Sequence, residues 1–127
     1  MDNVYIRIDG VDYIIPIAVI GSNQKLFEEY LKKNNNLLYL DVDKMIDDNK
    51  SSDLLRLYEH TVKSIEMNSL AMDGDYIEAA MKISNVYNDD KVLAKKAFKK
   101  NDISGYEIVL NGLKRALNFY NAIIIEK

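Results

Sequence analysis

The sequence predicts an α+β fold, in which an N-terminal β-hairpin packs on a bundle of four to five α-helices that ends in a long C-terminal helix. Three observations predict it. Apolar and polar side chains alternate near the N-terminus, an Asp-Gly pair follows them, and later apolar side chains recur every three or four residues. The 127 residues are near the usual size of one domain and contain no low-complexity linker, so we expect a single domain over 1–127.

The hairpin is expected to pair about residues 3–9 with about residues 11–17. The first segment alternates between aliphatic side chains and polar or aromatic ones, which is typical of a half-buried strand. Asp9-Gly10 predicts the tight turn between the strands, because glycine adopts a positive φ without steric cost. Pro16 has no backbone N–H, so the second strand should lie at a sheet edge or end there.

Helical periodicity dominates the rest of the chain. We expect helices at about residues 22–33, 53–70, 75–87 and 89–100, and a long helix that begins near Ser104. Two segments are ambiguous. Residues 37–48 alternate in part like a strand, although a short helix over 41–48 fits as well and is favoured. Ile123 to Ile125 either end the last helix or form a strand that pairs with the hairpin.

Composition excludes several classes of function. The chain has no cysteine, so disulfides, thiolate metal sites and cysteine nucleophiles are excluded. A protein without disulfides suits the reducing cytoplasm, where we expect this chain. The first residues carry no positive charge of a secretory signal, and no apolar run approaches the roughly 20 residues that cross a membrane.

The acidic and histidine residues do not predict a metal site or a catalytic site. Asp41-x-Asp43 and Asp73-Gly74-Asp75 resemble calcium loops only at their first positions, because Met45 and Ile77 stand where the fifth ligand of each loop should be. We interpret these acids as helix caps and turn residues. His60 is the single histidine and is expected on the surface. No catalytic residue, metal ligand or cofactor is predicted, and we expect no enzymatic activity.

A lysine-rich segment supports an alternative function, binding of nucleic acid. Five lysines occur within ten residues, and three of them are spaced by four residues, as on one face of a helix: Lys91, Lys95, Lys96, Lys99 and Lys100. The net charge of −3 opposes this interpretation, although it is unevenly distributed. Residues 1–75 carry 14 acidic against 8 basic side chains, whereas residues 76–127 carry 6 against 9.

Two sets of apolar or aromatic residues predict a surface that binds another protein. Tyr5, Tyr13 and Tyr39 are expected to be exposed, and tyrosine contributes a large contact area at low entropic cost. Ile77 and Met81 widen the apolar stripe of the helix expected at 75–87, which suggests a contact on two sides. Another copy of the chain is a further candidate partner, through the hairpin edge or the apolar helix faces.

The segment from Tyr5 to Pro16, YIRIDGVDYIIP, followed by an amphipathic helix, resembles the start of small phage tail assembly chaperones. These proteins commonly open with a hairpin and continue as helices. The resemblance covers about 30 residues and implies transient binding to a tail tube or tape-measure protein. Lys, Asn and Ile make up about a third of the chain, which indicates an AT-rich genome such as that of a low-GC bacterium or its phages.

The sequence therefore predicts a non-enzymatic protein-binding module encoded by a phage or mobile element. It would act as an assembly chaperone or as an inhibitor that occludes a partner, for example a host defence protein, in the host cytoplasm. The alternatives are a nucleic-acid-associated protein that uses the Lys91–Lys100 segment, and a small-ligand or enzymatic domain without a recognisable motif.

Overall fold

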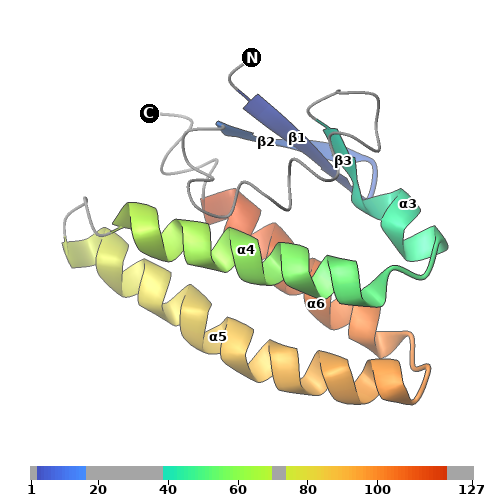
Figure 1. The fold of residues 1–127 in the computed structure, drawn as a ribbon. Helices are drawn as coiled ribbons and strands as arrows, with labels where there is room; N and C mark the ends of the chain where they lie inside the picture. The colour runs from blue at the N-terminus through green and yellow to red at the C-terminus, as the bar shows by residue number, and fades with distance from the viewer. Residues whose placement is uncertain (1–2, 17–38, 70–73, 120–127) are drawn as a thin grey trace.

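The structure, a computed structural model, describes residues 3–16, 39–69 and 74–119 (Figure 1). The described elements are, in chain order, the strands β1 (Asn3–Ile8), β2 (Val11–Pro16) and β3 (Tyr39–Asp41) and the helices α3 (Val42–Asp47), α4 (Ser51–Ser69), α5 (Gly74–Lys99) and α6 (Ser104–Phe119). These residues are mostly helical with a small three-stranded sheet near the N-terminus, in agreement with the predicted α+β class. The helix expected at 22–33 and the segment 123–125 lie outside the described residues.

The predicted N-terminal hairpin is confirmed. β1 and β2 are antiparallel, and Ile8 pairs with Val11, so only two residues connect the strands. These two residues are Asp9, with φ of 51°, and Gly10, with φ of 74°. Two successive positive φ values suit the right-handed twist of the strands that they connect.

Charged side chains from two helices hold the hairpin turn. The carboxylate of Asp43 in α3 accepts hydrogen bonds from the backbone N–H of Asp9 at 2.7 Å and of Gly10 at 3.0 Å. Lys114 of α6 donates a hydrogen bond to the carboxylate of Asp9, which raises the pKa of Lys114 above its ordinary value. Asp41 caps α3, because its side chain accepts a hydrogen bond from the backbone N–H of Lys44. The interpretation of Asp41 as a helix cap is confirmed, whereas Asp43 is a residue of α3 itself, where its side chain binds the hairpin turn.

The ambiguous segment 37–48 contributes both a strand and a helix to the described structure. β3 pairs in parallel with β1, with Leu40 opposite Ile6, and α3 begins directly after it. β1 is therefore the central strand, in the order β2-β1-β3. For this segment a short helix over 41–48 was favoured, and a strand was the alternative. The third strand is a correction, and it satisfies backbone groups on the second edge of β1.

α5 corrects the helix prediction most clearly. Separate helices were expected at 75–87 and 89–100, whereas α5 is one helix of 26 residues. The expected helices left a break at Asn88, and asparagine and aspartate, which follow one another from Asn88 to Asp90, have only modest helix propensity. Tertiary contacts outweigh this preference, because Tyr87 and Ala94 are buried on either side and Asp90 accepts a hydrogen bond from Tyr58 of α4.

The start of α4 also differs from the prediction. A helix was expected from about residue 53, but α4 already begins at Ser51. Asn49 adopts a φ of 57° in the preceding turn, a left-handed conformation that asparagine tolerates better than most residues. α6 begins at Ser104, as predicted, and at 16 described residues it is shorter than α5.

The elements form layers, with α5 farthest from the sheet. Figure 1 shows α4 and α6 beneath the sheet and α5 below both of them, and each of these three helices contacts the other two. One cluster of buried side chains joins the sheet to the helices. Its fully buried members include Ile6, Ile8, Leu40, Leu54, Tyr58, Ile65, Val109 and Leu113. The face of α5 opposite α4 and α6 is not covered by any described element.

Gly112 allows α6 to approach Tyr58 of α4. A Cβ atom at Gly112 would overlap Oη of Tyr58, which is fully buried and hydrogen-bonded to Asp90. We predict that Gly112→Ala lowers the free energy of unfolding by about 1–3 kcal/mol through overpacking, as measured by urea denaturation. Gly74→Ala is the matched control, because a Cβ there meets no atom within 4 Å. Equal stability of the two variants would contradict the described packing.

Candidate functional site

Two open hollows follow one another along α4 and α5 in the part of the chain that the structure describes. The first, of about 380 Å³, is lined by Glu66, Ile77, Ala80, Met81, Ser84, Asn85 and Asn88. The second, of about 370 Å³, is lined by Ser51, Ser52, Leu55, Arg56, Glu59, Lys91, Lys95, Phe98 and Lys99. We refer to these two hollows together as the α4–α5 groove.

The geometry of α5 explains why one helix lines both hollows. The α5 residues at positions 77, 81, 84, 88, 91, 95 and 99 are separated by three or four residues throughout. Such spacing keeps side chains on one side of an α-helix. The buried residues Ala80, Ile83, Tyr87, Ala94 and Ala97 form a second stripe, which faces the core. α5 thus has one side for the core and another for the groove.

The structure brings together candidate residues that the sequence analysis had treated as separate sites. Ile77 and Met81 were predicted to bind protein, and the lysines of 91–100 to bind nucleic acid. Because α5 is continuous, Ile77 and Met81 line one end of the same groove whose other end is lined by Lys91, Lys95 and Lys99. Lys96 on α5 and Lys100 directly after it are exposed but do not line the groove.

The basic end of the groove carries positive charge that described residues leave largely unneutralised. Lys91, Lys95, Lys96, Lys99 and Lys100 form no ion pair within 4 Å with other described residues. Glu59 is the acid that lines this hollow, and its carboxylate contacts Lys63 at 2.9 Å. The hydrogen bond from Lys63, with smaller contributions from the charges of Lys63 and Lys91, lowers the pKa of Glu59. Arg56 lies 4.0 Å from Asp53, and both are partly exposed.

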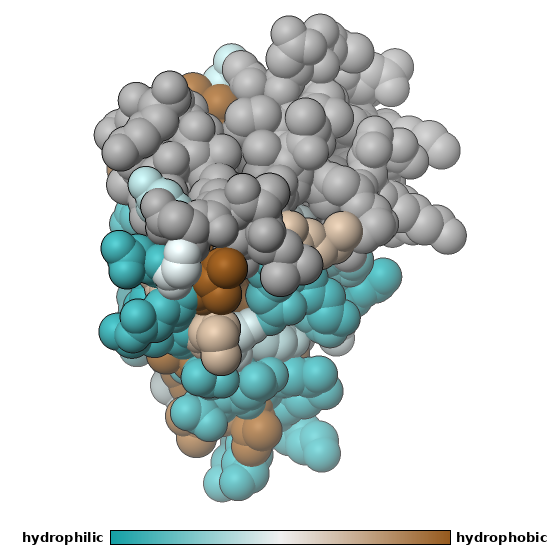
Figure 2. Space-filling view, turned by 90° about the vertical axis from the view of Figure 1, so that its left-hand side faces the viewer, coloured by the Kyte–Doolittle hydropathy of each residue, from teal (hydrophilic) through white to brown (hydrophobic). Residues whose placement is uncertain are grey.

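Large apolar side chains are exposed beside these charges. Met81 is 60% exposed and Val92 is 53% exposed. Val92 follows Met81 by 11 positions, which is close to three helical turns, so both side chains lie on the groove side of α5. Leu93, also 53% exposed, faces away from the groove. Figure 2 shows hydrophobic atoms between hydrophilic ones in the lower part of the molecule, where α5 lies in Figure 1. Mixed surfaces of this kind are typical of protein interfaces.

A buried polar contact supports the groove from below. Tyr58 of α4 donates a hydrogen bond to Asp90 of α5 at 2.6 Å, and its ring meets the ring of Tyr87 edge-on at a centroid distance of 4.9 Å. Burial, followed by the hydrogen bond to Asp90, raises the pKa of Tyr58 above its ordinary value. Burial and the charge of Glu59 also raise the pKa of Tyr87. These contacts fix the relative position of the two helices that form the groove.

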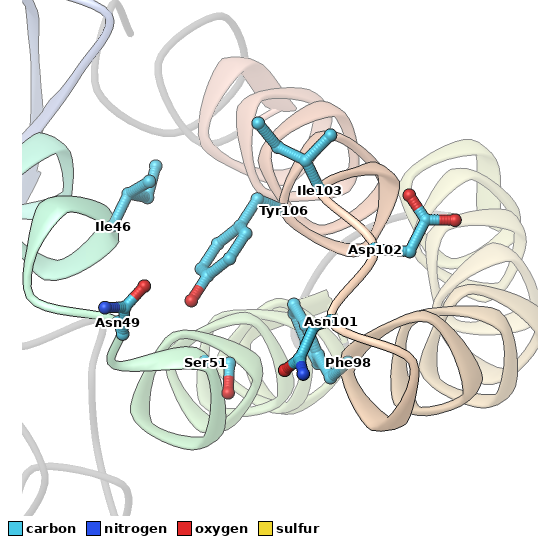
Figure 3. Close-up of a pocket in the computed structure, with 8 residues that line it drawn as sticks. All are labelled: Ile46, Asn49, Ser51, Phe98, Asn101, Asp102, Ile103 and Tyr106. Atoms are coloured by element: carbon cyan, nitrogen blue, oxygen red, sulfur yellow. The ribbon is translucent and has the colours of Figure 1, made fainter.

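A third hollow, of about 430 Å³, extends the groove around the end of α5 (Figure 3). It shares Ser51 and Phe98 with the basic hollow. Figure 3 shows the ring of Tyr106 pointing into the space between the α3–α4 turn and the end of α5. The rings of Phe98 and Tyr106 are 5.1 Å apart, and Ile103 at the rim is 74% exposed. An apolar side chain of a partner could therefore enter here.

The predicted tyrosine surface is not formed as one cluster. Tyr5 is 40% exposed, and the register places Tyr39 opposite it on β3. Tyr13 pairs with the buried Ile6 and is itself packed against the core, so it lies on the face of the sheet opposite Tyr5. The prediction of an exposed Tyr13 was wrong, because the strand alternation was assigned without knowing which strands pair.

His60 is less exposed than expected. It is half-buried on α4, and burial lowers the pKa of its imidazole below the ordinary value. Among the described residues, no three His, Asp or Glu side chains lie close enough to hold a metal ion. Within the same residues, no helix has the length and apolar character required to cross a membrane.

No protein-family model, no curated protein and no solved structure matches this chain.

Sequence reasoning missed the contribution of α4 to the groove. Ser52, Arg56, Glu59 and Glu66 line it, at successive intervals of four, three and seven residues, which keep side chains on one side of a helix. This stripe could have been found as a second helical face of mixed charge. Its proximity to the lysines of α5 could not have been found, because it depends on how two helices pack.

The buried Tyr58 predicts how stability depends on pH. Above about pH 10 tyrosine ionises in the unfolded chain, whereas the folded chain keeps Tyr58 neutral because its pKa is raised. Its contribution to the free energy of unfolding is therefore present below pH 10 and is lost as pH rises, by up to about 1.4 kcal/mol per pH unit. We predict that Tyr58→Phe destabilises the protein at pH 7 by about 1–3 kcal/mol through loss of the hydrogen bond to Asp90.

Urea denaturation of both proteins between pH 7 and pH 11.5 measures this effect. The difference in stability between the wild type and Tyr58→Phe should shrink above pH 10, since the phenylalanine variant has no group to titrate at this position. A difference that stays constant across this range would contradict the assignment of Tyr58 as a buried neutral hydroxyl.

Proposed function

We propose that this chain is a non-enzymatic protein-binding module that contacts its partner through the α4–α5 groove. The observation that supports this most directly is the continuity of α5. One helix places the exposed side chains of Met81 and Val92 on the same side as Lys91, Lys95 and Lys99. Exposed apolar side chains that are aligned and flanked by charged residues are typical of an interface with a hydrophobic centre and a polar rim.

The binding would act in one of two ways, as an assembly chaperone or as an inhibitor that occludes a partner. The resemblance of Tyr5 to Pro16 to phage tail assembly chaperones supports the first, and an origin in a phage or mobile element is compatible with both. Both need an accessible surface and no catalytic group. The α4–α5 groove is such a surface, and it is carried by helices that are anchored to the core by Tyr58 and Tyr87.

Site-specific photocrosslinking tests this function. A photoreactive amino acid at Met81 or Val92, on the groove side of α5, should crosslink one discrete protein in the cells that naturally make the chain. The same group at the exposed Asn111 of α6 is the matched control, because it lies on a different helix and does not line the groove. We expect the crosslinked product at Met81 and Val92 and its absence at Asn111, read by mass spectrometry.

Two outcomes would contradict the proposal. No discrete crosslinked protein at either groove position would argue against a protein-binding function. A product of equal yield at Asn111 would show that the partner does not use the α4–α5 groove.

A second candidate function, binding of nucleic acid, is favoured by the lysines of α5 that have no ion pair with described residues. In that case a gel-shift experiment at low salt should show a complex with duplex or single-stranded DNA. Binding should weaken steeply as salt increases, with a slope of about 0.9 per phosphate contact. Replacement of Lys95, Lys96 and Lys99 by Gln should weaken it further. The absence of a complex at low salt would remove this candidate.

A further inference from the structure

We propose that the α4–α5 groove binds an acidic amphipathic helix of a partner protein, an inference that rests on the proposed function and names the chemistry of the partner. The two ends of the groove differ. Ile77 and Met81 line one end, and Arg56 with three lysines lines the other. A complementary surface would therefore carry apolar side chains in one half and carboxylates in the other.

The lysines at the basic end of the groove have no acidic partner within 4 Å among the described residues. These lysines are Lys91, Lys95 and Lys99, and Glu59 is already engaged by Lys63. Arg56 keeps a 4.0 Å contact with Asp53, and solvent weakens it because both side chains are partly exposed. Carboxylates of a partner would neutralise these charges and guide its approach.

The spacing along α5 fits a helix better than an irregular segment. Seven of the ten α5 residues that line the groove follow one another at intervals of three or four positions from Ile77 to Lys99, and these 22 steps span about 33 Å along a helix. Helices that pack in a groove present side chains at the same intervals. Lys91, Lys95 and Lys99 are about one turn apart, so carboxylates one turn apart on the partner would meet them.

The groove suits an acidic protein segment better than a nucleic acid. Lys91 to Lys99 cover about 12 Å, over which a DNA duplex presents about seven phosphate charges. Leu55, Phe98 and Met81 supply apolar surface that phosphates cannot use but that aliphatic side chains can.

A designed peptide is the probe. It is a fluorescein-labelled helix of about 24 residues that carries Leu on one face of one half and Glu on the same face of the other half. We prepare it with the halves in both orders, since the partner could run parallel or antiparallel to α5. We expect at least one of these peptides to bind the full chain, as measured by fluorescence anisotropy, and its affinity to fall as salt increases.

Two variants with the same net charge locate the contact. The triple variant Lys91→Glu, Lys95→Glu and Lys99→Glu reverses the charge at the basic end of the groove. It should weaken peptide binding by about tenfold or more. Lys82→Glu with Lys96→Glu and Lys100→Glu makes the same change in charge on exposed residues, in α5 or directly after it, that do not line the groove. It should leave the affinity within about threefold. If the Glu variant of the groove is unfolded by circular dichroism, the corresponding Gln variant replaces it.

A charge exchange completes the test. A peptide with Lys in place of Glu should bind the groove-reversed variant more tightly than it binds the wild type. The proposal would be overturned by equal losses in the two charge variants, by tighter binding of a single-stranded DNA of similar length, or by no binding of either acidic peptide. A dimer of the chain that the groove variant abolishes would also overturn it, since the occupant would then be a second copy.

This experiment separates the partner class from the proposed function. If Met81 crosslinks a discrete protein in cells while neither acidic peptide binds, protein binding stands and the acidic helix is rejected. If crosslinking fails as well, both are rejected.

Discussion

The hydrogen bond from Tyr58 of α4 to Asp90 of α5, made beside Gly112 of α6, is the contact on which the arrangement of the three long helices depends. The phenol ring is fully buried and fills the space that a side chain at position 112 would need. Its hydroxyl satisfies a carboxylate at the middle of α5, in a segment where local propensity favours a break. One side chain therefore holds α4, α6 and the continuity of α5 together.

The groove follows from that continuity. A helix broken near position 88 would present a short apolar segment and a short basic one with no fixed relation. As one helix of 26 residues, α5 aligns Ile77 and Met81 with Lys91, Lys95 and Lys99 along a single side. Since α5 packs on α4 and α6 by its alanine-rich stripe, this second side stays uncovered by described elements. The same packing that buries the core thus exposes the surface on which the proposed function rests.

The sheet depends on different contacts, which are polar and connect elements that are far apart in the chain. The carboxylate of Asp43 accepts hydrogen bonds from both backbone N–H groups of the hairpin turn. Lys114, in the last described helix, donates a hydrogen bond to Asp9. β3 is only three residues long, and it is held because it pairs with β1 and because Leu40 is buried beside Ile6. Two strands alone would be marginally stable, so this third strand and the helices below complete the sheet.

The sequence by itself determined the elements whose signals are local. These are the hairpin around Asp9-Gly10, the amphipathic helices α4 and α6, and the cap of α3 at Asp41, each set by turn chemistry or periodicity within a few residues. The sequence also supplied half of the groove residues on α5, but as two unrelated sets. Only the tertiary structure decided that α5 is continuous, that Tyr13 faces the core, and that Arg56 lies beside the lysines. The reason is that these outcomes depend on contacts between residues distant in the chain, such as Tyr58 and Asp90, whose energies outweigh local propensity and leave no periodic pattern.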